Sequence, residues 1–132
     1  MRDKSNDIPI GTTLPPISVA AAGNAMSQAY VDVSTAAWWV ALCAIGASAG
    51  TATFKFRQAT DASGTGTKDV AGSPGSATLA LSTANTFGSL DLDPQALDLA
   101  NGFHFVGVRA DVATGTVLVG AALVACDPHY AT

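Results

Sequence analysis

The sequence predicts a single all-β domain, either a β-sandwich or a jelly-roll-like barrel of about seven or eight strands. Short apolar runs show period-two alternation, and turns rich in Gly, Ser, Thr and Asp separate these runs. The chain has 132 residues, of which 48% are hydrophobic, and this is enough to bury one core. We divide it into an extended N-terminal arm, residues 1–11, and a β-sandwich domain, residues 12–132.

The arm begins with polar residues and continues as Ile8, Pro9, Ile10 and Gly11. Pro9 disfavours helix and favours extended backbone. Ordering such a segment costs on the order of 1–2 kcal/mol per residue, so an ordered arm needs a partner surface. We expect the arm to be disordered in the isolated protein and to order in an assembly, with Ile8, Pro9 and Ile10 in contact with a partner chain.

In the first part of the domain, the sequence predicts three strands. A strand over 12–21 contains Pro15 and Pro16, which remove ladder donors, so we expect an edge or irregular strand. A second strand is expected over 29–33. The segment 36–45 is apolar on both faces, and its length and Ala content leave helix possible, but the Gly-rich turn after it favours a strand.

The segment 51–60 has the clearest strand pattern in the chain. Ala52, Phe54 and Phe56 alternate with polar residues, which is typical of a half-buried strand because successive side chains leave on opposite faces. Residues 61–67 form a Gly/Thr turn, 68–70 a short strand and 76–82 a weakly alternating strand.

In the last third of the chain, the sequence predicts a helical turn followed by two strands. Asp93 suits a helix N-cap and Gly102 a C-terminal stop, so 91–102 is expected to be a short helical turn or a structured loop. Strands over 103–112 and 116–126 are joined by three residues that include Gly115, which indicates a β-hairpin.

The composition argues against an enzyme. The ten acidic residues are all Asp, and only two His are present, so few groups can act as acid, base or nucleophile. Asp91, Asp93 and Asp98 could be imagined as a calcium site, but their spacing lacks the calcium-loop pattern and favours capping. His104 is expected to be a packed or surface strand residue. We expect no catalytic residue, no cofactor and no metal.

The charge, the apolar runs and the cysteines limit which kinds of partner we expect. The net charge is −4, and Lys55 and Arg57 are the densest basic pair beyond the N-terminus, so no nucleic-acid partner is expected. No apolar run approaches the roughly 20 residues that a membrane helix needs, so no membrane partner is expected either. Cys43 and Cys126 lie in apolar runs and suit buried free thiols, while a disulfide within or between chains stays open.

Two aromatic and tail features point to protein contacts. In a strand, Trp38 and Trp39 send one indole to each face. Either both are buried, or another chain covers one face of this strand, since Trp is favoured in interface cores. In the C-terminal tail, His129 and Tyr130 are more suited to a partner contact than to catalysis.

Three stretches carry a resemblance: 51–61 (TATFKFRQATD) with 68–70 (KDV), the late strand 105–112 (FVGVRADV), and the tail 127–130 (DPHY). They resemble a family of small tailed-phage and prophage structural proteins. The resemblance implies a bacteriophage virion protein of the capsid cement (decoration) type, which binds the major capsid protein on the capsid surface. It further implies synthesis in the bacterial host cytoplasm and a homo-oligomer, either a trimer or a dimer.

Two other functions stay open from the sequence. A receptor- or glycan-binding β domain of a tail or head fibre would use Trp38 or Trp39, Tyr30 and the Thr/Ser-rich loops. A hydrolase with an unrecognised site around His104 is the remaining alternative.

Overall fold

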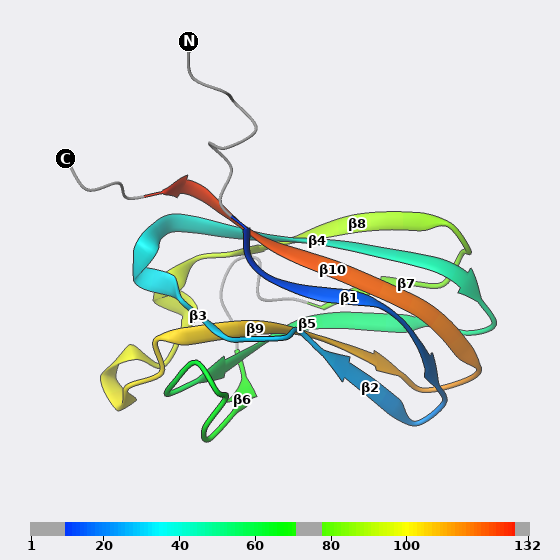
Figure 1. Ribbon diagram of the computed structural model, residues 1–132, viewed down its shortest axis with the longest axis horizontal. Coiled ribbons are helices and arrows are strands. Elements are labelled where there is room, and N and C mark those ends of the chain that lie inside the picture. Colours follow the sequence, from blue (N-terminus) through cyan, green and yellow to red (C-terminus); the bar gives the residue numbers. More distant parts are fainter. Residues whose placement is uncertain (1–9, 71–77, 129–132) are drawn as a thin grey trace, which may run out of the picture.

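The computed structural model describes residues 10–70 and 78–128. It is a sandwich of two antiparallel sheets, which confirms the predicted all-β fold class (Figure 1). The four-stranded sheet has the order β1 (Ile10–Ala20), β10 (Thr116–Pro128), β4 (Ala36–Ser48), β8 (Thr86–Leu92). The six-stranded sheet has the order β2 (Gly23–Met26), β9 (Phe105–Val112), β5 (Ala52–Ala59), β6 (Lys68–Asp69), with β3 (Val31–Asp32) on β9 and β7 (Leu79–Leu81) on β5.

The chain changes sheets at both ends of the sandwich, and most of these crossings lie at one end. Four short connections, here called arches, link β1 to β2, β4 to β5, β7 to β8 and β9 to β10, and each joins a strand of one sheet to a strand of the other (Figure 1). The predicted hairpin between 103–112 and 116–126 is therefore wrong. β9 pairs with β2, β3 and β5, whereas β10 pairs with β1 and β4. A short Gly loop can close a hairpin or bridge two sheets, and its sequence alone does not distinguish the two.

Two of these arches lie against each other. The Ala49 amide donates to the Thr116 carbonyl over 2.9 Å. A Cβ atom at Gly50 would lie 1.8 Å from the Thr114 carbonyl oxygen. At Gly115, where φ is +71°, a Cβ would lie 2.3 Å from the Ala49 carbonyl oxygen. Glycine at both positions lets the β4–β5 and β9–β10 arches stack backbone to backbone.

The core fills the space between the sheets. Phe54 and Phe56 point inward from β5, as the alternation over 51–60 predicted, and belong to the same buried cluster as Leu92 and Leu123 of the opposite sheet. The expected strand over 36–45 is confirmed as β4. Its Trp39 is buried, and the indole nitrogen donates to the Val33 carbonyl over 3.1 Å. A buried indole N–H needs such an acceptor, so this bond fixes the start of β4.

The first strands depart from the expectation in detail. β1 begins at Ile10, two residues before the expected domain boundary, and the register with β10 shifts between Leu14 and Ile17. This is the irregular edge strand that Pro15 and Pro16 predicted. Ile8, Pro9 and the rest of the expected arm before Ile10 lie outside the described residues.

Other elements also differ from the sequence-based expectation. The expected strand 29–33 is reduced to Val31–Asp32, because the Asp32 carboxylate accepts from the Ser34 amide and starts a 3-10 turn, η2 (Val33–Thr35). β8 was not predicted. Of the expected strand 76–82 only β7 is formed among the described residues.

The expected helical turn over 91–102 is confirmed as two 3-10 turns, η3 (Pro94–Ala96) and η4 (Leu99–Asn101). The Asp93 carboxylate accepts from the Gln95 amide over 3.0 Å, and Gly102 ends η4 with φ of +84°. Within residues 10–70 and 78–128, no helix has the length and hydropathy to cross a membrane.

Candidate functional site

The outer surface of the four-stranded sheet is almost free of charge. In antiparallel pairs, directly opposed residues share a face, so the register of β1, β10, β4 and β8 identifies the outward side chains. We call this surface the apolar face. Its described members are Ile10, Thr13, Ser18, Trp38, Val40, Leu42, Ala44, Gly46, Phe87, Ser89, Asp91, Leu118, Gly120, Ala122, Val124 and Cys126. Asp91 is the one charged residue among them.

Large and small residues alternate across the apolar face. Leu42 is 53% exposed and lies opposite Ala122, while the next row places Ala44 between Gly120 and Phe87, which is 85% exposed. The small residues lower the surface beside Leu42 and leave a groove of about 510 Å³. The groove is lined by Thr13, Leu14, Pro15, Pro16, Leu42, Ala44, Gly120, Ala121 and Ala122. Protruding and recessed apolar groups therefore lie side by side.

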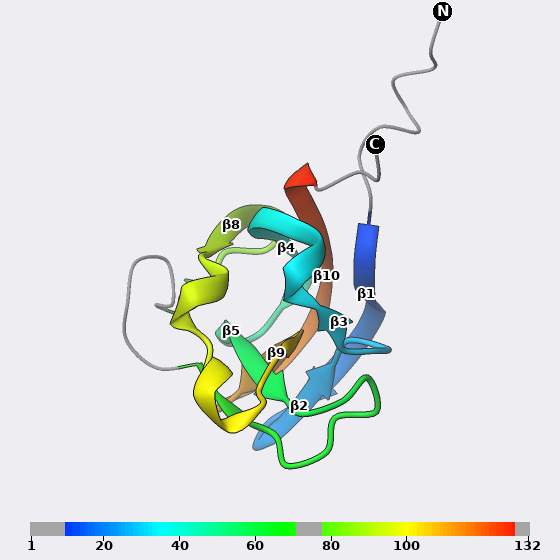
Figure 2. The same ribbon diagram turned by 90° about the vertical axis from the view of Figure 1, so that its left-hand side faces the viewer.

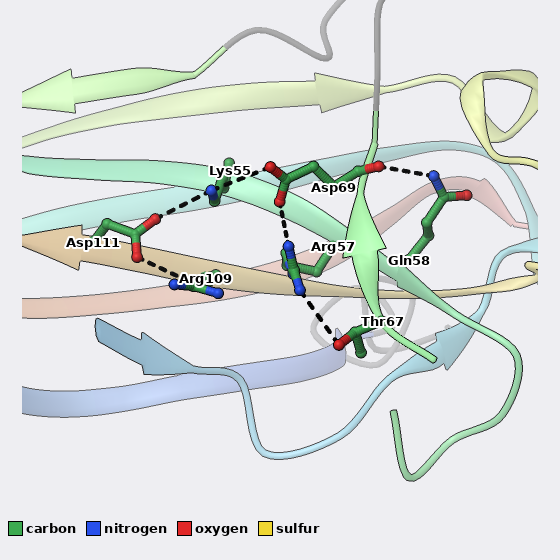
Figure 3. A network of polar contacts seen from close by, with 7 residues as sticks. All are labelled: Lys55, Arg57, Gln58, Thr67, Asp69, Arg109 and Asp111. Carbon is green, nitrogen blue, oxygen red and sulfur yellow. Dashed lines mark hydrogen bonds and ion pairs between the residues drawn. The ribbon is translucent and has the colours of Figure 1, made fainter. Parts of the chain in front are cut away.

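The outer surface of the six-stranded sheet has the opposite character, as Figure 3 shows. We call the cluster of Lys55, Arg57, Asp69, Arg109 and Asp111 the charged face. The Lys55 ammonium lies 3.4 Å from carboxylate oxygens of both Asp69 and Asp111. Arg57 also binds Asp69, and Arg109 Nε lies 2.8 Å from Asp111. The hydrogen bond from Arg57 lowers the pKa of Asp69 below its usual value. The two layers are seen from the end in Figure 2.

A second polar cluster ties the 3-10 turns to the six-stranded sheet. The buried Gln58 side chain donates to the Asp69 carbonyl over 2.9 Å and accepts from the Asp98 amide over 2.7 Å. The Lys68 ammonium lies 2.6 Å from the Asp98 carboxylate and 4.2 Å from the centre of the Phe103 ring. Hydrogen bonding from Lys68 lowers the pKa of Asp98. These contacts hold the loop before β9. Together with the charged face, they pair all four Lys and Arg residues of the described ranges, Lys55, Arg57, Lys68 and Arg109.

The structure separates the acidic residues that could be imagined as a calcium site. Asp93 caps η3, Asp98 pairs with Lys68, and Asp91 lies on β8. In the described ranges, no group of three or more His, Cys, Asp or Glu side chains is placed to hold a metal ion. His104 is exposed in the segment before β9, where its backbone carbonyl accepts from the Val33 amide over 2.9 Å.

The two indoles leave opposite sides of β4, as expected. Trp39 is 3% exposed and belongs to the core, so it offers no surface to a partner. Trp38 is half-buried on the apolar face and lies opposite Cys126. Tyr30 lies on the other side of the sandwich, where its ring packs over Gly107 of β9. Trp38 and Tyr30 therefore form no common surface. His129 and Tyr130 lie outside the described residues.

The cysteines also lie on opposite sides of the four-stranded sheet. Cys43 faces the core, and burial raises the pKa of its thiol to about 12. Cys126 is half-buried on the apolar face. Both are free, and the sheet between them rules out a disulfide within one chain. Cys43 is the expected buried thiol, whereas Cys126 is a surface member of the apolar face.

The apolar face could be found from the sequence only in part. The pattern of 36–45, apolar on both faces, indicated that the outer side of this strand is apolar too. The contributions of Gly120 and Ala122 carry no such signal, because small residues suit a core, a turn or an interface equally. Comparison with protein-family models, with curated proteins and with solved structures found no match.

Proposed function

We propose that this chain is a structural protein of the bacteriophage virion, a capsid cement (decoration) protein that binds the major capsid lattice and stabilises the head. The apolar face is the observation that carries the proposal of an assembly protein, because a contiguous exposed apolar surface of this size is typical of a protein interaction site. The resemblance to tailed-phage structural proteins supports the capsid as the place of assembly.

The size of the apolar face is that of a protein interface. Its strands β1, β10, β4 and β8 have 11, 13, 13 and 7 residues. Each strand residue covers about 16 Å² of sheet, from a rise of about 3.3 Å and a strand spacing of about 4.8 Å, so the face measures roughly 700 Å². Specific protein interfaces bury about 800 Å² per partner, and their cores are depleted of charge.

A cement function asks for rigidity and many weak contacts, and not for a reacting group. The sandwich is held by a continuous core, and its arches are tied by backbone contacts, so the outer faces keep a fixed shape. Modest contacts add up when many copies bind neighbouring points of one lattice. The charged face supplies ion pairs and hydrogen-bonding groups that can meet such a lattice.

Mass spectrometry of purified virions tests the proposal. A cement protein should be present at a copy number comparable to that of the major capsid protein. Absence from virions would end the proposal, and a few copies per particle would move the protein to the tail or neck.

In the receptor- or glycan-binding alternative, Trp38 and Tyr30 would have to act separately, because they lie on opposite sides of the sandwich. Adsorption separates it from the cement proposal. Free protein added to cells should leave phage adsorption unchanged if the chain is a cement protein, and it should compete with phage if the chain binds a receptor.

A further inference from the structure

We propose that a second copy of this chain covers the apolar face, so that two sandwiches stack through their four-stranded sheets in a symmetric dimer. This inference deepens the proposed function by naming the partner of one surface. Its basis is the shape and charge of that surface, which do not depend on the capsid.

Charge and area both favour a second copy. The apolar face has no basic residue and one carboxylate, Asp91, among its described members, so it offers nothing to complement a charged partner. An identical face matches it in this respect. Asp91 lies on the outermost strand β8, where solvent reaches the rim of a stacked pair. The area of roughly 700 Å² per copy is close to the 800 Å² or so that a specific interface buries on each side.

The shape of the apolar face is complementary to a second copy of the same face. A two-fold axis parallel to the strands can lie just above the apolar face, midway between β10 and β4, the two central strands of the four-stranded sheet. It places β4 of each copy over β10 of the other, and β8 over β1. Leu42 then lies over the groove beside Gly120 and Ala122 of the second copy, and Phe87 lies over the bulge at Pro16. Both exposed side chains lose water at once, and aligned stacking of this kind is common between sheets.

The dimer leaves the charged faces on its two outer sides. A cement unit with two such faces can attach to two places on a lattice, and the second attachment is then intramolecular. Two-fold stacking thus converts one weak contact into a bridge.

Sedimentation of the full chain in free solution tests the dimer. Wild type should sediment as a dimer at micromolar concentration. Ala44 is exposed at the centre of the apolar face, so Ala44→Glu should fold normally and weaken the dimer by at least about a hundredfold, because two carboxylates would be buried without partners. Ala80→Glu is the matched control, since Ala80 is an exposed strand residue of β7 outside the apolar face, and it should stay dimeric.

A second variant tests the groove itself. A Cβ at Gly120 would have no neighbour closer than 3.7 Å, so Gly120→Leu fills the groove without disturbing the fold, as circular dichroism should verify. The monomer–dimer equilibrium of this variant should also lie further toward the monomer than that of wild type. A monomeric wild type, or dimers of Ala44→Glu and Gly120→Leu as tight as wild type, would overturn the inference. Neither result changes the copy number in virions, which decides the proposed function separately.

Discussion

The stacking of the arches makes a sharp prediction about two glycines with the same backbone conformation. Gly115 has φ of +71° and Gly66 has φ of +67°, so replacement by Ala imposes a similar left-handed penalty on both, roughly 1–2 kcal/mol. The surroundings differ. A Cβ at Gly66 would meet nothing within 4 Å, whereas at Gly115 it would lie 2.3 Å from the Ala49 carbonyl oxygen.

Gly115→Ala must push the two arches apart. Forcing an extra carbon into a close contact costs about 1–3 kcal/mol. The separation also strains the 2.9 Å hydrogen bond from the Ala49 amide to Thr116, worth about 1 kcal/mol. The free energy of unfolding should therefore fall by roughly 2–4 kcal/mol more in Gly115→Ala than in Gly66→Ala.

Urea unfolding, monitored by Trp fluorescence at one protein concentration, gives the free energy of unfolding of both variants. Each kcal/mol should also lower Tm by about 4 °C in a domain of this size. Equal losses of stability in the two variants would show that the arches do not touch as described, and the account of Gly115 would fail.

Three further predictions follow from single side chains. A thiol reagent should modify Cys126 in the folded monomeric variant, whereas Cys43 should react only after unfolding, and equal rates would contradict their placement on opposite sides of the sheet. Because Arg57 lowers the folded-state pKa of Asp69, that carboxylate stabilises the fold above about pH 4 and loses this effect as pH falls; Asp69→Asn should flatten the acid side of a stability–pH curve, and an unchanged curve would oppose this. Trp39→Phe loses the indole hydrogen bond and should cost about 1–3 kcal/mol in chemical unfolding, and a neutral result would contradict its role in the core.

The fold class could be predicted because strand alternation is a local property. The pattern over 51–60 identifies which side of β5 is buried, since only neighbours in the chain are needed to find it. The pairing of strands is a different matter. The loop that ends at Gly115 suits a hairpin as well as an arch, and the choice depends on β2, β5, β1 and β4, which are far away in the sequence.

The candidate site shows the same limit. The opposite directions of Trp38 and Trp39 follow from strand geometry, and the structure has them. The apolar face as a whole needs β10 between β1 and β4, and β8 at the edge, so no single segment contains it. β8 itself was missed because Gly88 and Ser89 interrupt its apolar pattern, while Phe87 points to the outside.

The order of strands in the four-stranded sheet has a consequence for synthesis of the chain. Among the described strands, β10 comes last in the chain, and it lies between β1, which comes first, and β4. Until β10 has emerged from the ribosome, β1 has no neighbour in this sheet and β4 has only β8, so the sheet can form completely only after all of its other strands have been made. Until then β4, which is apolar on both sides, has one unpaired edge. An unpaired apolar strand edge promotes aggregation, so a growing chain is exposed to it until β10 pairs with β4.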